Sequence, residues 1–140
     1  MEPTTTDIPA SERGMAVLAH LSGLSGYLVP LGGVLVPLIL YFVMKDESRP
    51  VARIALQALL LNVATWIAIA LFGVGVLTGV IGIALVESPD ASILAILGML
   101  VLVVAFVLVV VAALVLPIVG AIKASRGQYY RYPLIGLSPS

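Results

Sequence analysis

Few side chains in the apolar parts of this chain could take part in chemistry. Three stretches of more than 30 residues carry no formal charge, and the one imidazole within them is that of His20. Ser22 and Ser25 lie two and five positions from it, whereas facing side chains on a helix are about three or four apart. A lone histidine without cysteine or carboxylate neighbours is also a poor metal site. The sequence therefore predicts no enzyme, no metal site and no cofactor, with His20 hydrogen bonding at a helix interface or near the headgroups.

Polar residues of the second apolar stretch and its start form a second group of candidates. Arg53 and Gln57 are four positions apart, and Asn62 and Thr65 are three apart, so each pair shares a helix face. These groups could line a polar path through a membrane, together with His20. They could equally hydrogen bond between helices, as amides in membrane proteins commonly do.

Small residues recur at the spacing that lets helices approach closely. Ser22 and Gly26 are four apart, as are Gly75 and Gly79. Glycine at this interval allows backbones to pack where lipid competes with every apolar contact. The pattern predicts either a packed bundle or self-association.

The elements that must position these residues are indicated by composition. Hydrophobic residues make up 61% of the 140 positions and charged residues 10%, against roughly 45–50% and about 25% in soluble domains. The uncharged stretches, residues 14–44, 54–86 and 91–122, each exceed the roughly 20 residues with which a helix crosses a bilayer. We therefore expect an all-α integral membrane protein. A formal net charge of zero argues against a nucleic-acid partner, and the absence of cysteine excludes disulfides and thiolate chemistry.

The number of helical segments depends on the first stretch. Pro30 to Gly33 read PLGG near its middle, and proline and glycine together favour a break. The interpretation that we prefer is a bundle of four segments, in which two short ones form a hairpin and two long ones follow. Three helices are the alternative. The helix that contains the second stretch should begin near Pro50, with Ser48 as its candidate cap.

Charge placement predicts the organisation of the chain. Residues 1–11 should be a disordered acidic tail, 12–123 the transmembrane helical domain and 124–140 a basic aromatic interfacial tail. The connection after the first stretch and the segment after the third are basic, whereas residues 87–91 carry two acids and no base. Lysine and arginine favour the cytoplasmic side. We therefore expect a multi-pass protein of the bacterial inner membrane with the C-terminus, and in the four-segment version also the N-terminus, in the cytoplasm.

The C-terminal segment combines tyrosines with arginines. Aromatic rings and long cations both favour the headgroup layer of a membrane. The pattern therefore predicts an interfacial anchor. Its residues are Arg126, Tyr129, Tyr130, Arg131 and Tyr132.

Four motifs together resemble the Tic-twenty-like family. They are AHLSGL at 19–24, KDES at 45–48, ARIALQALLLN at 52–62 and AIKASRGQYYRYP at 121–133. That family comprises small bacterial membrane proteins related to a membrane subunit of the chloroplast inner-envelope translocon. The resemblance implies four helices with both termini cytoplasmic, in which Arg53 and Gln57 match a polar pair and residues 129–133 a closing motif. The sequence ARIAL departs from the more charged, histidine-containing version of many relatives.

These observations favour a non-enzymatic membrane protein that acts through helix contacts. It would be a subunit or assembly factor related to protein translocation, with the lipid bilayer and other membrane proteins, or further copies of itself, as partners. The alternative is a small channel or carrier whose path is lined by Gln57, Asn62, Thr65 and His20. A third hypothesis is a stabiliser that binds anionic lipid.

Overall fold

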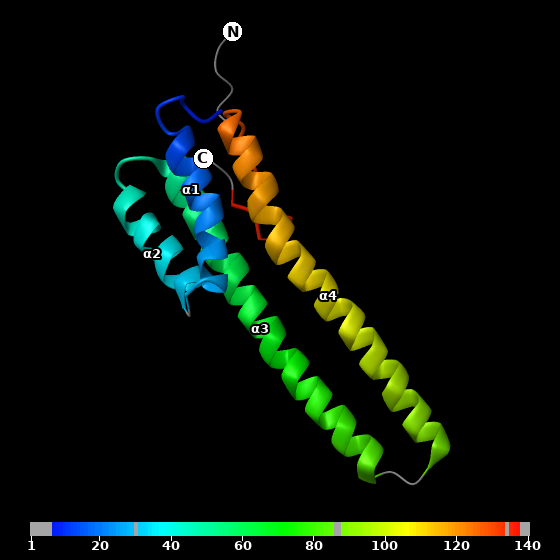
Figure 1. The fold of residues 1–140 in the computed structure, drawn as a ribbon. Coiled ribbons are helices and arrows are strands. Elements are labelled where there is room, and N and C mark those ends of the chain that lie inside the picture. The colour runs from blue at the N-terminus through cyan, green and yellow to red at the C-terminus, as the bar shows by residue number, and fades with distance from the viewer. Residues whose placement is uncertain (1–6, 30, 86–87, 134, 138–140) are drawn as a thin grey trace. The chain divides into compact units, whose positions relative to one another are not determined.

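The computed structural model describes residues 7–29, 31–85, 88–133 and 135–137, and these are helical for most of their length (Figure 1). The order is α1 (Arg13–Ser22), the 3-10 helix η1 (Gly23–Tyr27), α2 (Gly32–Met44), α3 (Arg49–Leu85) and α4 (Pro89–Ser125). Within the described ranges there is no β-strand, and Asp7 and Gln128 form an isolated bridge. The prediction of four helical segments, two short and two long, is confirmed, and the three-helix alternative is wrong.

The break in the first apolar stretch lies where the PLGG sequence predicts it. Leu31 has a φ of 64°, a left-handed conformation that a leucine rarely adopts, and α2 begins at the next residue. A Cβ on Gly32 would lie 2.8 Å from the backbone oxygen of Ser25. Glycine is therefore required where η1 and the start of α2 meet. Pro30 lies outside the described residues.

The start of α3 also agrees with the sequence. The Ser48 hydroxyl accepts a hydrogen bond from the Val51 amide at 3.4 Å, as a helix cap does. The same hydroxyl donates to the carboxylate of Glu12. This contact ties the beginning of α3 to the residue that precedes α1.

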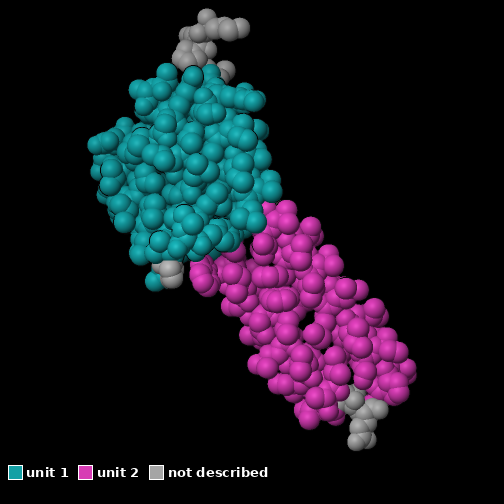
Figure 2. All heavy atoms as spheres, in the orientation of Figure 1, with its two compact units in different colours: residues 1–63, 113–140 teal, residues 64–112 magenta. Residues whose placement is uncertain are grey.

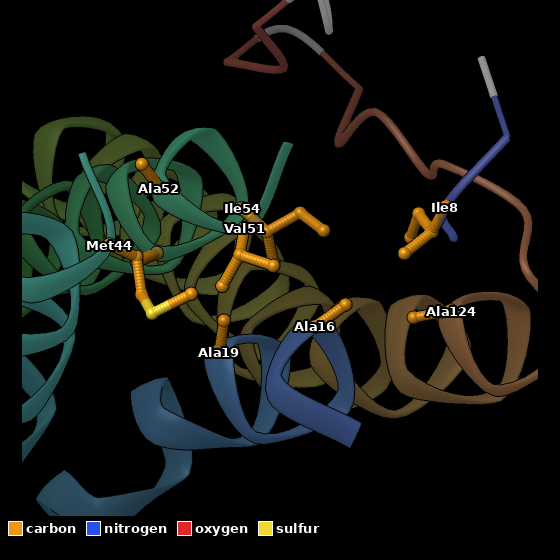
Figure 3. Packing of buried hydrophobic residues seen from close by; sticks show 9 residues of the cluster. Ile8, Ala16, Ala19, Met44, Val51, Ala52, Ile54 and Ala124 are labelled. Carbon is orange, nitrogen blue, oxygen red and sulfur yellow. The ribbon is translucent and has the colours of Figure 1, made fainter. Parts of the chain in front are cut away.

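The chain divides into two compact units (Figure 2). Unit 1 comprises residues 1–63 and 113–140, and unit 2 comprises residues 64–112. In unit 1 the core consists largely of small side chains, which let helices lie close together. Figure 3 shows Ala16 and Ala19 of α1 facing Val51 and Ile54 of α3.

The N-terminal segment differs from the prediction of a disordered tail over residues 1–11. Residues 1–6 lie outside the described part of the chain. From Asp7 on, the segment is held: the Ile8 amide donates to the Gly127 carbonyl at 2.7 Å. The Ile8 side chain is buried in the core together with Ala124 (Figure 3). A single apolar residue in a polar segment gave no sign of this burial.

Unit 2 is a pair of helical segments from α3 and α4. The rings of Phe72 and Phe106 stack with centroids 4.1 Å apart. The outward faces are apolar and exposed, with Leu71 at 65% and Val101 at 70%. By length and composition, α3 and α4 are the two helices among the described residues that could cross a membrane.

Candidate functional site

Gln57 lies at the centre of a polar cluster in unit 1. Its side chain is fully buried on α3. The amide nitrogen Nε2 donates to the Tyr129 hydroxyl at 2.7 Å, and the amide oxygen Oε1 accepts from the Tyr132 backbone N–H at 3.0 Å. Both ends of one amide therefore hold the segment that follows α4.

Tyr129 extends this cluster toward the C-terminus. Its hydroxyl donates to the Leu137 carbonyl at 3.1 Å while accepting from Gln57. Burial raises the pKa of Tyr129 to about 12, although the positive charge of Arg53 and the Gln57 hydrogen bond oppose the shift. The phenol is therefore neutral at ordinary pH and can both donate and accept.

His20 is the second buried polar group that meets the C-terminal segment. Its Nδ1 and the Tyr132 hydroxyl are hydrogen bonded at 2.9 Å, and the imidazole tautomer decides which of them donates. The side chain of Tyr132 is only 2% exposed, and burial, followed by the charge of Tyr130, raises its pKa. His20 thus forms its hydrogen bond between α1 and the segment that follows α4. Its Nε2 has no hydrogen-bond partner in the described part of the chain.

Gly120 makes this arrangement possible. It lies on α4, and a Cβ at this position would collide with Nδ1 of His20. Sequence reasoning missed Gly120 because a single glycine in a membrane-type helix is unremarkable in itself. The sequence around Gly120 carries no signal that would have singled it out.

The residues of the predicted interfacial anchor are divided between surface and interior. Arg126 is exposed, as is Arg131, whose guanidinium donates to the Gly136 carbonyl at 3.2 Å. Tyr130 is half-buried, with the Lys123 ammonium 4.6 Å from its ring centroid. Tyr129 and Tyr132 instead turn inward to Gln57 and His20. A sequence of alternating arginines and tyrosines is compatible with tyrosines at the surface and with tyrosines in the interior. A phenol can hydrogen bond either to a headgroup or to a buried amide.

Asn62 of α3 also holds chain segments together by hydrogen bonds, at the place where η1 and α2 meet. Its Nδ2 donates to the carbonyls of Gly23 and Ala58, each at 3.1 Å. A Cβ on Gly23 would lie 2.8 Å from this nitrogen, and one on Gly33 would overlap Oδ1. The amide therefore fits against glycines of η1 and α2.

The predicted small-residue positions lie at contacts inside the chain. A Cβ on Gly26 would lie 3.1 Å from Gly33, and the Ser22 hydroxyl donates to the Ala19 carbonyl at 2.7 Å. In unit 2, a Cβ on Gly75 would lie 2.5 Å from Leu102, and one on Gly79 would lie 3.0 Å from Met99. Of the two readings, packing within one chain accounts for these glycines without a second copy.

The polar side chains give little support to a path for solutes. Gln57 and Asn62 direct their amides to partners within unit 1, Arg53 is half-buried near Tyr129, and Thr65 is a half-buried residue of unit 2. Across the described ranges, no group of three His, Cys, Asp or Glu side chains could hold a metal ion. The polar groups of this site hydrogen bond chain segments to one another.

The class of protein that emerges is a small all-helical chain with two long apolar helices and a polar cluster that holds its C-terminal segment. The model of the magnetosome magnetite crystal formation protein family (MamF/MmsF) matches residues 11–138, and the chain belongs to this family. No curated protein and no solved structure matched the chain.

The resemblance to the Tic-twenty-like family was wrong, and the role in protein translocation that it implied falls with it. Alanine and leucine make up half of AHLSGL and most of ARIALQALLLN, two of the motifs on which it rested. Such residues recur in any tightly packed apolar helix, so short matches of this kind do not distinguish families. The family match, by contrast, extends over almost the whole chain.

Proposed function

We propose that this protein is a small integral membrane protein of the magnetosome that contributes to magnetite crystal formation without catalysing a reaction. The observation that carries the proposal is the family match over residues 11–138. The two long apolar helices support it, because a protein of a membrane-bounded compartment needs segments that remain in lipid.

Exposed apolar surface supports insertion in a bilayer. Large side chains of α4 such as Leu94 and Val101 are each 70% exposed, and the most apolar windows of α3 and α4 are 0% and 6% buried within the protein. Soluble monomers rarely expose contiguous apolar patches larger than a few hundred Å². Lipid would cover these helices.

Length indicates which helices would cross. Helices α3 and α4, with 37 residues each, exceed the roughly 20 residues that span a hydrocarbon core of about 30 Å. Helices α1 and α2, with 10 and 13 residues, are too short. We therefore propose two crossings, with α1 and α2 as a hairpin that enters from the same side, and both termini in the cytoplasm.

A non-enzymatic role is supported by what the polar groups do. Gln57, Asn62 and Tyr132 are engaged in contacts that hold the protein together. The proposed action is therefore through binding: to lipid, and to other membrane proteins or further copies of this chain.

The test is made in a magnetite-forming bacterium from which the gene for this protein has been deleted. We expect crystals of altered size or number in electron micrographs, restored by a tagged wild-type copy that stays in the magnetosome membrane fraction after alkaline carbonate washing. Normal crystals in the deletion strain would contradict the role in crystal formation. Release of the tagged protein by carbonate would contradict membrane insertion.

A further inference from the structure

A basic groove in unit 1 adjoins the polar cluster. It has a volume of about 400 Å³ and is lined by Lys45, Arg49 and Arg53, with Tyr41, Leu56 and Leu137 among its other walls. The three cations are spaced four residues apart from the end of α2 into the second turn of α3. No carboxylate lines the groove among the residues that the structure describes. An anion is the ligand that such a wall would attract.

The position of Arg49 and Arg53 at the start of α3 makes an anionic ligand more favourable still. A helix N-terminus carries a partial positive charge of about half an elementary charge, which favours acids and disfavours bases there. Yet α3 begins with Arg49 and has no acidic residue in its first turn. A bound anion would be stabilised by the arginines and by the helix dipole together.

The remaining walls indicate that the ligand is amphiphilic. Leu56 and Leu137 contribute apolar surface directly beside the cations. The exposed apolar side chains of α2, including Ile39 at 61% and Phe42 at 56%, end just before Lys45. The Lys45 ammonium lies 5.5 Å from the centroid of the Phe42 ring. In a membrane, lipid phosphate groups lie at the level where an apolar helix surface ends and cations follow.

We propose that this groove binds the phosphate headgroup of an anionic phospholipid. Arginine pairs with phosphate oxygens through two parallel hydrogen bonds and lysine adds a point charge, while the lipid chains follow the apolar surface of α2. Leu137 lies on the segment that Gln57 holds through Tyr129, so the polar cluster also positions one wall of the groove. The inference rests on the proposed membrane insertion and does not depend on magnetite formation.

The experiment is a lipid titration of the full-length protein in mild detergent, followed by native mass spectrometry. The probes are phosphatidylglycerol, which is anionic, and phosphatidylcholine, which is zwitterionic. The double variant Lys45→Gln/Arg49→Gln removes two exposed cations of the groove. The matched control Lys123→Gln/Arg126→Gln removes two exposed cations near the end of α4. Carbonate extraction of the membrane, described above, tests insertion separately.

We expect a preference for phosphatidylglycerol that falls roughly tenfold in the groove variant and changes by less than about twofold in the control. Equal losses in both variants would show diffuse attraction to surface charge and would overturn the proposal, as would the absence of any preference. Displacement of phosphatidylglycerol by an equal concentration of inorganic phosphate would assign the groove to free phosphate instead. Thermal unfolding of both variants without added lipid verifies that they fold.

Discussion

Gln57 shows how much one side chain can do when both of its polar ends are used. Its amide joins the middle of unit 1 to Tyr129 and to the backbone of Tyr132. A typical hydrogen bond contributes about 0.5–1.5 kcal/mol net, whereas leaving a buried partner unsatisfied costs about 1–3 kcal/mol. Removing this amide should therefore cost more stability through the buried groups left without a partner than through the lost hydrogen bonds themselves.

Gln57→Leu keeps the approximate volume and removes both hydrogen bonds. We expect the free energy of unfolding to fall by about 1–3 kcal/mol for each buried group left unsatisfied, and trypsin to cut faster at Arg131. Thermal unfolding in detergent and limited proteolysis measure the two effects. Gln128→Leu makes the same change at an exposed position and should leave both unchanged. Similar cleavage rates for the two variants would show that Gln57 does not hold the segment.

Gly120→Ala addresses the other half of the polar cluster. The added methyl group would collide with the His20 ring, and overpacking of this kind costs about 1–3 kcal/mol. Gly98→Ala is the control on the same helix, because a Cβ there meets nothing within 4 Å. We expect a lower unfolding temperature for Gly120→Ala only. Equal unfolding temperatures would place the His20 ring elsewhere.

At the scale of elements, the two segments of unit 2 approach each other along glycines. Gly75 and Gly79 face Leu102 and Met99, whose flexible side chains could yield to a single methyl group. A β-branched residue is bulkier and stiffer at χ1, so Gly75→Ile/Gly79→Ile should force α3 and α4 apart within unit 2.

The matched control for this change is Gly73→Ile/Gly82→Ile, since a Cβ at either position meets nothing within 4 Å. We expect the first double variant to unfold in detergent at a lower temperature than the control. If the control is destabilised as strongly, close approach of the helices is not what these glycines provide.

The helices and the break between them could be predicted from the sequence because their signals are local. Proline and glycine at 30–33 interrupt an apolar run, and Ser48 precedes a helix start. The position of the C-terminal segment could not be predicted. Its contacts join residues 72, 75 and 112 positions apart, and no periodicity in the sequence reports on such distances. Hydrogen bonding between helices was one of two hypotheses for Gln57, and its partners in the C-terminal segment could not be predicted.

At the scale of the whole molecule, the proposed topology can be tested with single cysteines because the natural chain has none. Ser11→Cys and Gln128→Cys should react with a membrane-impermeant maleimide only after cells are lysed. Asp90→Cys, in the first turn of α4, should react only after detergent has opened the magnetosome vesicles. All three positions are exposed within the protein, so any protection comes from the membrane. Reaction of Ser11→Cys only after the addition of detergent would place the two termini on opposite sides.

The division of unit 1 between the two ends of the chain has a consequence for the order of events during synthesis. Residues 1–63 emerge from the ribosome first, but the amide of Gln57 and the imidazole of His20 find their partners only at Tyr129 and Tyr132. Domains generally fold as units during synthesis, the N-terminal one first, but unit 1 is not continuous in sequence. Unit 1 therefore cannot be completed before Tyr129 and Tyr132 have been synthesised, and until then Gln57 and His20 lack these hydrogen-bond partners.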